Sequence, residues 1–312
     1  MGIFQNRDQY EGYNIYSMKK YVDKKRITFI IIAIIAVIVT LSLTIFYLVD
    51  TTIRVKKAKD FAKQVTEFAQ QQQEIENKKK EEEEAKRQAK IPKLTEQGKE
   101  NLKNIYHSNE KIAYLTFDDG PTTSVTPKIL DILKAEDVKA TFFVLGSQVE
   151  IFPETTNRIY NEGHYIANHG YSHKSSIIYQ SPEPVLNEFN QCNQLVAKTI
   201  NVPEYNSHLF RFPGGSVGGK YADLKVQAEM LLEQNDILHI DWNSLTGDSE
   251  KVNPTEEYLM NNLQKTTEGK NSLVILMHDA QAKHITAETL PKVIEYLQQQ
   301  GYAFKNFYEI FK

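Results

Sequence analysis

From about Lys111 to the C-terminus, short runs rich in β-forming residues alternate with stretches typical of helices. The β-rich runs are 112–117, 140–146, 165–168, 209–213, 237–242, 272–277 and 302–307, and the helical stretches include 127–135, 184–200, 221–234 and 286–300. Such alternation over about 200 residues predicts an α/β fold with a parallel sheet. Seven strand runs are too few for a complete eightfold barrel. We therefore expect a distorted, shortened (β/α) barrel, with an open sheet as the alternative.

Residues that carry chemistry gather at the ends of five of these runs. They are Asp118 and Asp119, His169 and His173, Arg211 with Gly214 and Gly215, Asp241 and Trp242, and His278 and Asp279. Taken singly, each group has an ordinary interpretation, such as a turn, a surface histidine pair, a structural ion pair or a core tryptophan. Because the C-terminal strand ends of α/β barrels form the active face, their joint occurrence predicts one site.

Three of these residues have the character of metal ligands. Asp119, His169 and His173 would give a divalent ion one carboxylate and two imidazoles. That set leaves coordination positions open, which is the pattern of a catalytic rather than a structural metal site.

Other strand-end residues suit acid–base chemistry around such a metal. Asp118 is placed to take a proton from water as general base, and His278 to protonate a leaving group. Asp241 is a candidate to orient His278 and raise its pKa. Backbone N–H groups in the glycine-flanked turn after Pro213 are candidates to hold an oxyanion.

The segment Ile27–Val49 is a run of 23 residues without a charge. As a helix it would span roughly 34 Å, enough for a hydrocarbon core of about 30 Å. We therefore predict a single transmembrane signal anchor at 27–49, with a cleaved signal peptide as the alternative. Basic residues flank both ends, so the positive-inside rule is close to a tie. We expect residues 1–26 to form a cytoplasmic tail and the rest to lie outside.

Residues 50–110 are rich in Lys, Glu, Gln and Ala. Apolar residues recur at helical spacing from Val55 to Phe68, so we expect a charged helical stalk or linker. A homodimeric coiled coil is the alternative, although the apolar repeat fades after Phe68. The catalytic domain is then expected at 111–312.

Charge and cysteine content narrow the classes of protein. The net charge of −3 averages a basic N-terminal region with residues 111–312, which carry eight more acidic than basic side chains. This balance excludes a strongly basic nucleic-acid binder, so no nucleic-acid partner is expected. The single cysteine, Cys192, excludes a disulfide framework and any multi-cysteine metal cluster.

Five motifs, in order, give residues from about Lys111 to Lys312 a resemblance to the polysaccharide deacetylase family (NodB-homology domain, carbohydrate esterase family 4). They are Thr116-Phe117-Asp118-Asp119-Gly120, His169-Gly170-Tyr171-Ser172-His173, Arg211-Phe212-Pro213-Gly214-Gly215, Asp241-Trp242 and Leu276-Met277-His278. The resemblance implies metal-dependent removal of acetyl groups from sugars, usually N-acetylglucosamine. The metal would be zinc, with cobalt or another divalent ion as alternatives.

The resemblance also implies a role for each matched residue. Asp118 would be the base, His278 the general acid, Asp119, His169 and His173 the metal ligands, Arg211 the residue that orients Asp118, and Asp241 the residue that tunes His278. Trp242 and Leu276 would line the pocket for the acetyl methyl group, and the Gly214 N–H would hold the oxyanion.

Two positions depart from the family pattern. Gly170 replaces a serine or threonine that usually braces the histidine loop, so we expect a looser loop. Gly214 stands where many members have tyrosine, which predicts a wider or reshaped groove with the backbone donor retained.

We therefore expect an envelope deacetylase anchored in the cell membrane, with its catalytic domain on the extracellular face and a cell-wall glycan as substrate. Peptidoglycan N-acetylglucosamine is the first candidate substrate. N-acetylglucosamine in a wall polysaccharide or its linkage unit is the alternative. A non-catalytic glycan-binding envelope protein is the competing class.

Overall fold

A computed structural model describes residues 26–41 and 52–311. The chain divides into two compact units, Met1–Glu83 and Glu84–Lys312. The described strands are β1 (Ile112–Asp118), β2 (Thr141–Val144), β3 (Tyr165–Asn168), β4 (Leu209–Phe210), β5 (Leu238–His239), β6 (Ser244–Leu245), β7 (Ser272–His278) and β8 (Ala303–Lys305). The helices are α2 (Thr52–Gln88), α3 (Glu96–Lys103), α4 (Thr126–Ala135), α5 (Gly146–Ile151), α6 (Pro153–Asn161), α7 (Ser175–Ile178), α8 (Pro182–Thr199), α9 (Ala222–Gln234), α10 (Glu256–Thr267) and α11 (His284–Gln299), with a 3₁₀ turn at Phe307–Glu309.

The first unit is helical wherever it is described. Residues 26–41 form one helix, and α2 is a continuous helix in the region where helical spacing predicts one. Salt bridges along α2 join Lys63 to Glu67 and Glu76 to Lys80, as expected for a solvated charged helix. Residues 1–25 and 42–51, including part of the expected membrane span, lie outside the described residues. Among the helices that are described, none has both the length and the apolar character for a membrane crossing.

The second unit is built on a parallel sheet with the strand order β5-β4-β3-β2-β1-β7-β6, and β8 pairs with β1. Central strands β1 and β7 are buried along nearly their whole length. Helices cover one face of the sheet, and other core residues cover the opposite face. That explains their continuous apolar sequence, which is typical of parallel strands. The edge strands β5 and β6 do not pair in this order, so the sheet is an incomplete barrel. The predicted shortened barrel is confirmed.

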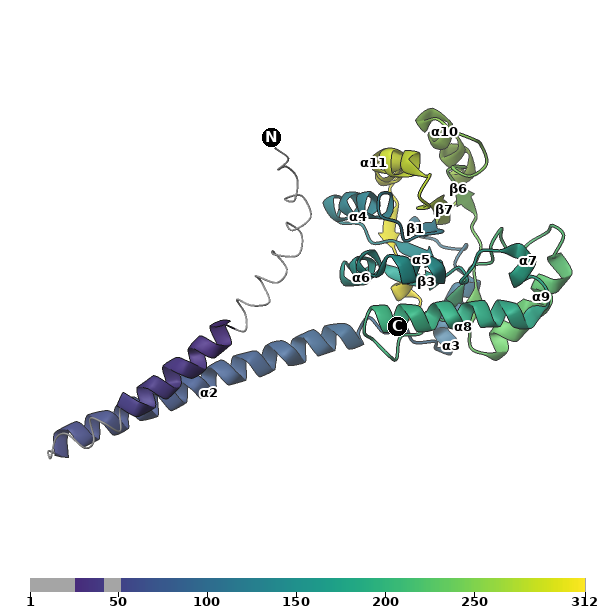
Figure 1. The fold of residues 1–312 in the computed structure, drawn as a ribbon. Helices are drawn as coiled ribbons and strands as arrows, with labels where there is room; N and C mark the ends of the chain where they lie inside the picture. Colours follow the sequence, from purple (N-terminus) through teal and green to yellow (C-terminus); the bar gives the residue numbers. More distant parts are fainter. Residues whose placement is uncertain (1–25, 42–51, 312) are drawn as a thin grey trace, which may run out of the picture. The chain divides into compact units, whose positions relative to one another are not determined.

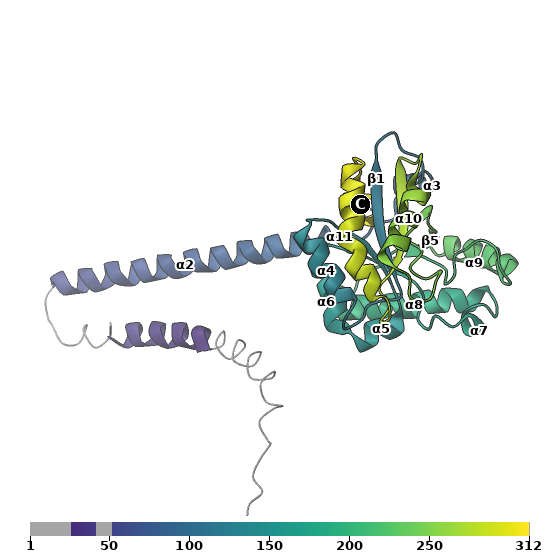
Figure 2. The ribbon, with the colours of Figure 1, turned by 90° about the horizontal axis from the view of Figure 1, so that it is seen from above.

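A belt of helices packs on the outer face of the sheet. Contacts run from α10 through α11, α4 and α6 to α8 and α9 (Figure 1). Figure 2 shows α11 beside β1, with α4 on the other side of α11. The core of this layer includes Leu115 and Phe117 of β1, together with Leu290 and Ile294 of α11. The layer fixes the strands from outside, so the strand ends share one rim.

The inner face of the sheet is covered partly by sequence that precedes β1. Leu102 and Ile105 are buried in a core with Tyr165, Phe307 and residues of the C-terminal turn. Thr95 caps α3 by accepting a hydrogen bond from the Gly98 N–H at 3.0 Å. The expected boundary at residues 110 and 111 therefore falls inside a compact unit. The segment before residue 111 is highly charged, so its composition gave no sign that Leu102 and Ile105 pack on the sheet.

Candidate active site

Two central strands deliver the first pair of site residues side by side. Asp118 ends β1 and His278 ends β7, and they are partners in the register of the two strands. Because every strand pair in the sheet is parallel, both residues lie at the same rim. Residues 160 positions apart in the sequence are thus brought together as the strand-end argument predicts.

Asp119 follows β1 in a strained conformation. Its φ is 80°, in the left-handed region that few non-glycine residues adopt. Its N–H donates to the carbonyl oxygen of Phe143 at 3.3 Å. Its Oδ1 is buried and has no hydrogen-bond partner among the described residues. Since buried polar atoms are nearly always paired, this oxygen is a ready ligand for a cation.

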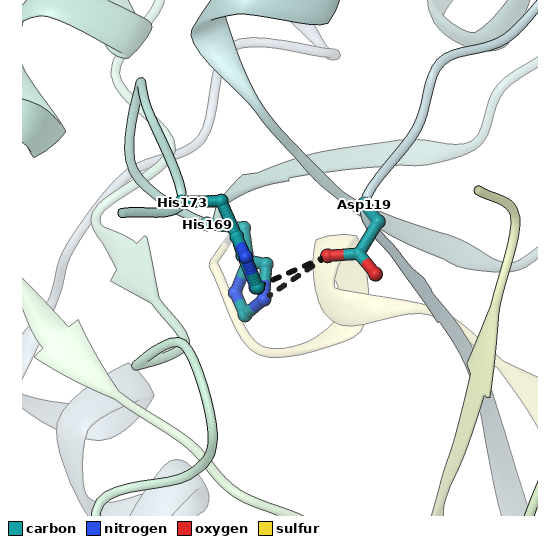
Figure 3. Close-up of side chains that lie close together, drawn as sticks. All are labelled: Asp119, His169 and His173. Atoms are coloured by element: carbon teal, nitrogen blue, oxygen red, sulfur yellow. Dashed lines mark ion pairs between the residues drawn. The ribbon is translucent and has the colours of Figure 1, made fainter. Parts of the chain in front are cut away.

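Both predicted histidine ligands face that oxygen (Figure 3). The Nε2 atoms of His169 and His173 lie 3.6 and 3.3 Å from Asp119 Oδ1. The Nδ1 atom of His169 lies 2.8 Å from the Arg211 carbonyl oxygen, a contact that directs Nε2 towards Asp119. Burial lowers the pKa of His169 to about 3, so its imidazole is neutral, the form that binds metal.

A loop with two left-handed residues, and not a helical turn, carries the two histidines. Gly170 has φ +87° and His173 has φ 56°. The Gly170 N–H donates to Asn168 Oδ1 at 2.8 Å. A β-carbon at Gly170 would stand 3.2 Å from Glu188 Oε2, which is tighter than ordinary contact. The backbone conformation and the close carboxylate together favour glycine here.

Glu188 fastens this loop from α8. Its Oε2 accepts the N–H groups of Tyr171 and Ser172, both at 2.6 Å, and its Oε1 accepts the Ser172 hydroxyl at 2.7 Å. Glu188 is itself buried. The loop that we expected to be looser is therefore held by three charge-assisted hydrogen bonds. No sequence motif singles out Glu188.

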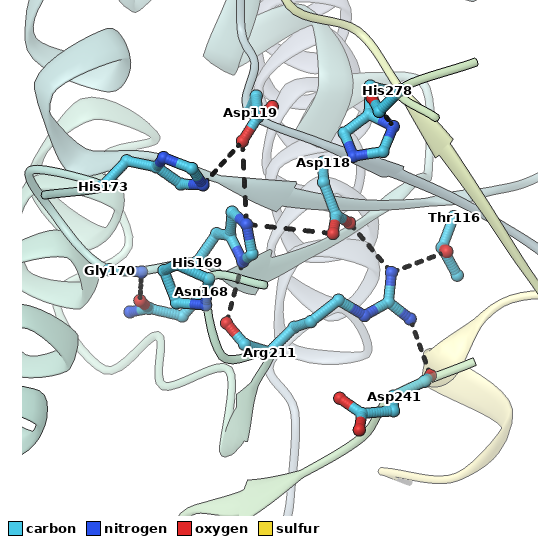
Figure 4. Close-up of polar contacts among 12 residues, drawn as sticks. Thr116, Asp118, Asp119, Asn168, His169, Gly170, His173, Arg211, Asp241 and His278 are labelled. Atoms are coloured by element: carbon cyan, nitrogen blue, oxygen red, sulfur yellow. Dashed lines mark hydrogen bonds and ion pairs between the residues drawn. The ribbon is translucent and has the colours of Figure 1, made fainter. Parts of the chain in front are cut away.

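Arg211 connects the fourth strand with Asp118 (Figure 4). Its fully buried guanidinium donates from Nη1 to Asp118 Oδ1 and to Thr116 Oγ1, both at 2.8 Å. The same group lies 3.9 Å above the ring of Phe143. Burial raises the pKa of Asp118, and the Arg211 charge opposes that rise. The contact implied between Arg211 and Asp118 is present.

The partner of His278 is Asp248, and the expectation that Asp241 plays this role is wrong. Asp248 Oδ1 lies 2.8 Å from His278 Nδ1, and Oδ2 accepts the His278 backbone N–H at 2.8 Å. Thr286 Oγ1 donates to Asp248 Oδ2 at 2.7 Å. Burial lowers the pKa of His278, but the hydrogen bond and charge of Asp248 outweigh it and raise that pKa to about 8.

Sheet order explains the correction. Asp241 comes just after β5, at one edge of the sheet, whereas Asp248 follows β6, the neighbour of β7. The Asp241 carboxylate accepts the N–H of Ser216 at 3.0 Å and its hydroxyl at 2.7 Å. In Figure 4 this carboxylate lies on the opposite side of the Arg211 guanidinium from His278.

The loop after Arg211 depends on two glycines, Gly214 and Gly215, for its backbone conformation. Gly214 and Gly215 have φ values of +76° and +77°, which tyrosine would rarely adopt. A β-carbon at Gly214 would meet no atom of residues 26–41 or 52–311 within 4 Å. Tyr179 donates its hydroxyl to the Pro213 carbonyl oxygen at 2.7 Å, and the Lys225 ammonium donates to that of Gly215. The loop therefore has free space beside Gly214, and hydrogen bonds from Tyr179 and Lys225 hold its carbonyl groups.

Trp242 and Leu276 take different places around the rim. Leu276 lies two residues before His278 on β7 and so shares its face of the sheet. The Trp242 ring packs against Gly215, and the Arg211 guanidinium carbon lies 5.8 Å from the ring centre. Trp242 therefore lines the back of the glycine loop.

Asp279, which stands with His278 at the end of its strand run but was assigned no role, supports the turn that follows β1. Its N–H donates to the Asp118 carbonyl oxygen at 3.0 Å, and its Oδ2 accepts the Thr126 hydroxyl at 2.6 Å. A β-carbon on Gly120 would come within 2.0 Å of that carboxylate, so only glycine fits. Burial raises the pKa of Asp279 to about 7.

The residues at the centre of this site fit a divalent metal. The ligand atoms of Asp119, His169 and His173 all lie within 4.8 Å of one another, and one of them is the Asp119 oxygen that receives no hydrogen bond from the described part of the chain. Nitrogen and carboxylate donors in this combination suit zinc and related transition ions.

Comparison with known proteins places the chain. The family model "Polysaccharide deacetylase" matches residues 105–232. A peptidoglycan-N-acetylglucosamine deacetylase of Bacillus cereus is 33% identical over 204 residues, which cover 64% of this chain and 70% of that protein. A Streptococcus mutans CE4 esterase structure aligns with TM-score 0.61 and 28% identity, covering 69% of this chain and 92% of that one. The catalytic domain of a peptidoglycan N-acetylglucosamine deacetylase from Eubacterium rectale aligns with TM-score 0.58 and 29% identity, covering 64% of this chain and 90% of that one.

The chain belongs to the polysaccharide deacetylase family, carbohydrate esterase family 4. It is thereby an enzyme of the amide-hydrolase class, and the family's metal dependence in general agrees with the Asp/His/His cluster.

Proposed function

We propose that this protein is a metal-dependent deacetylase that removes N-acetyl groups from N-acetylglucosamine residues of a bacterial cell-envelope glycan, with peptidoglycan as the first candidate. One observation carries the proposal. The cluster of Asp119, His169 and His173 lies at the same rim as Asp118 and His278. The relatives named for peptidoglycan N-acetylglucosamine support the choice of substrate.

Asp118 is the proposed general base. Burial raises its pKa, which favours acceptance of a proton, and Arg211 Nη1 fixes its Oδ1 at 2.8 Å. Hydrolysis adds one water across the amide C–N bond, and Asp118 takes the proton that this water gives up as its oxygen bonds to the acetyl carbon. A metal held by Asp119, His169 and His173 would polarise the acetyl carbonyl and lower the pKa of water.

His278 is the proposed general acid. Its pKa of about 8 keeps it protonated at neutral pH, and Asp248 fixes Nδ1 so that Nε2 is the proton donor. Proton transfer to the amide nitrogen allows the C–N bond to break, which leaves acetate and a free amine. The Gly214 N–H is the proposed donor to the oxyanion, from a loop that is open in front.

The finer identity of the substrate has two candidates. The acidic balance of residues 111–312 favours a neutral N-acetylated sugar over an anionic polymer. N-acetylglucosamine in a wall polysaccharide or its linkage unit is the second candidate, because the Gly214 loop leaves more room than a tyrosine would. Zinc is the proposed metal, with cobalt or another divalent ion as the alternative.

We also propose the cellular arrangement. Residues 27–49 form a signal anchor, with 1–26 in the cytoplasm, α2 as a spacer and the catalytic unit on the extracellular face. The uncharged run of 23 residues supports the anchor. A homodimer through α2 stays a prediction. Carbonate extraction of membranes checks the anchor: the full chain should stay with the membrane, and deletion of 27–49 should release it. Equal release of both would contradict the anchor.

Acetate release tests the enzymatic proposal. The purified full-length chain is loaded with Zn²⁺ or Co²⁺ and given N-acetylglucosamine oligomers, peptidoglycan or purified wall polysaccharide. We expect release from at least one glycan, abolished by a chelator and restored by metal. A chain that neither binds metal nor releases acetate from any of these glycans would instead be the non-catalytic glycan-binding protein.

A further inference from the structure

The loop after β4 contains a tight turn formed by Phe212, Pro213, Gly214 and Gly215. The Gly215 N–H donates to the Phe212 carbonyl oxygen at 2.8 Å, and the φ of Gly214 is +76°. Proline at the second position and a positive φ at the third are typical of a type II turn. Types I and II differ mainly in the orientation of the central peptide group, which here joins Pro213 to Gly214. The direction of the Gly214 N–H therefore depends on which way this peptide group is turned.

One side chain holds the central peptide group of this turn. The Tyr179 hydroxyl donates to the Pro213 carbonyl oxygen at 2.7 Å, and the Tyr179 side chain is buried. Burial raises the pKa of Tyr179, so the hydroxyl keeps the proton that it donates. Because a trans peptide group is planar, its carbonyl oxygen and its N–H point in opposite directions. Tyr179 thereby directs the Gly214 N–H away from the buried core.

The Gly214 N–H is available to a ligand. Gly214 is exposed, and its N–H donates to no carbonyl oxygen of residues 26–41 or 52–311. A hydrogen bond accepted by the carbonyl oxygen of a peptide group polarises that group and makes its N–H a stronger donor. The Tyr179 hydroxyl therefore both orients and strengthens the Gly214 donor.

The next peptide group of the loop is fixed at both ends. The Lys225 ammonium donates to the Gly215 carbonyl oxygen, and the Asp241 carboxylate accepts the Ser216 N–H at 3.0 Å. The same ammonium lies 5.0 Å from the centre of the Tyr179 ring, a cation–π contact that helps to hold the ring in place. Since the peptide group after Gly215 is held in this way, the orientation of the central one depends on Tyr179.

We propose that Tyr179 is a positioning residue for the oxyanion donor: its hydroxyl holds the Gly214 N–H in the orientation that binds the negative charge developing on the acetyl oxygen. The inference rests on the proposed function, in which the Gly214 N–H is that donor. It adds a residue outside the five motifs, just after α7, which acts through the backbone and does not touch the substrate.

Tyr179→Phe tests this role, because it removes one hydroxyl and keeps the ring. Acetate release by the metal-loaded full-length chain is measured on the N-acetylglucosamine tetramer. We expect kcat to fall about tenfold, which corresponds to about 1.4 kcal/mol. The KM and the metal content should stay at their wild-type values, because the lost interaction acts in the transition state. Tyr221→Phe, whose ring centre lies 5.0 Å from that of Tyr179, is the matched control and should behave as wild type.

Gly214→Ala disturbs the same peptide group by another route. The added methyl group would meet no atom of the described residues within 4 Å, but alanine disfavours the positive φ of a type II turn. We expect kcat to fall about 10²-fold, as for the loss of one oxyanion donor. Adding Tyr179→Phe to Gly214→Ala should lower kcat no further, because both changes act on one peptide group. Additive losses would contradict this shared cause.

Binding of a transition-state analogue gives a reading without turnover. The probe is the N-acetylglucosamine tetramer in which a methylphosphonamidate replaces one acetamide, so that a tetrahedral P–O⁻ group imitates the oxyanion. Calorimetry on the metal-loaded full-length chain should show about tenfold weaker binding by Tyr179→Phe than by wild type, with Tyr221→Phe unchanged.

The outcomes separate the positioning role from the proposed function. Equal kcat in wild type and Tyr179→Phe, or equal affinity for the analogue, would overturn the positioning role and leave the deacetylase in place. If wild type binds the analogue without releasing acetate, the two affinities decide the role of Tyr179. A wild-type chain that neither releases acetate nor binds the analogue would overturn both proposals.

Discussion

The two halves of the rim, one with the proposed metal ligands and one with the proposed acid, differ in how far apart in the sequence their interacting residues lie. On the metal side, Asp119 follows Asp118 directly, and the two histidines stand four residues apart. On the acid side, His278 pairs with Asp248, 30 residues earlier and on the neighbouring strand connection. The candidate ligands that short spacing within a motif predicted do lie close together, whereas the partner of the proposed acid depends on which strand lies beside β7.

The largest expected effects separate binding from chemistry on the metal side. His169→Ala should weaken metal affinity by at least about 100-fold, because it removes a ligand rather than a supporting group. Asp118→Asn should keep the metal and lose turnover by about 10²–10⁴-fold, because only the base is removed. Metal content of the purified chain and acetate release are measured together. An active Asp118→Asn chain would end the assignment of the base.

The acid side is tested by two matched substitutions. Asp248→Asn should lower kcat by about 10²–10⁴-fold, because His278 loses the charge that keeps it protonated. The pH profile carries the sign: activity needs protonated His278 and falls as pH rises through about 8. In Asp248→Asn this fall should begin at lower pH, nearer the ordinary pKa of about 6.5.

Asp241→Asn is the control for Asp248→Asn. Its carboxylate contacts Ser216 and not His278, so the alkaline fall should stay where it is in wild type even if the rate drops. A shift of the alkaline fall in Asp241→Asn, with none in Asp248→Asn, would restore the original assignment.

The brace on the histidine loop should matter less than the ligands. Glu188→Gln keeps the shape but removes the charge that the N–H groups of Tyr171 and Ser172 share. We expect metal affinity to fall about 10–100-fold, measured by competition with a chelator. Glu150→Gln is the matched control, since the one hydrogen bond that the Glu150 side chain makes with the described residues comes from the exposed Tyr171 hydroxyl. Equal affinities in both variants would show that the brace does not position the ligands.

The smallest expected effect concerns stability. The folded-state pKa of His278, about 8, exceeds the unfolded value of about 6.5, so its contribution is complete below about pH 6.5 and is lost as pH rises through 8. The difference corresponds to about 2 kcal/mol. Urea unfolding of metal-free wild type and His278→Gln at pH 6 and pH 9 checks it. The gap between the two proteins should narrow by about that amount at pH 9, and a constant gap would contradict the raised pKa.

Sequence periodicity predicted most of the fold but missed one two-residue strand. Each of the seven expected strand runs contains a strand, but β6, only Ser244–Leu245, gave no signal. That strand pairs with β7 and places Asp248 beside His278. The missing element and the wrong partner therefore have one cause.

The remaining misses are contacts that no local pattern encodes. Glu188 lies in the middle of α8, where a glutamate usually faces solvent. Leu102 and Ile105 are two apolar residues in a highly charged segment, so composition indicated a linker where the chain in fact packs on the sheet. Only the three-dimensional path of the chain decides both cases.

Arg211 has a consequence for how mutants at this position are interpreted. Its guanidinium holds Asp118, but its carbonyl oxygen meets His169 Nδ1, and this oxygen belongs to every amino acid. A substitution at position 211 therefore removes the contact with Asp118 but keeps the carbonyl oxygen that contacts His169. The tautomer of His169 is set by the backbone at position 211, so a substitution there leaves the tautomer unchanged as long as the backbone keeps its path.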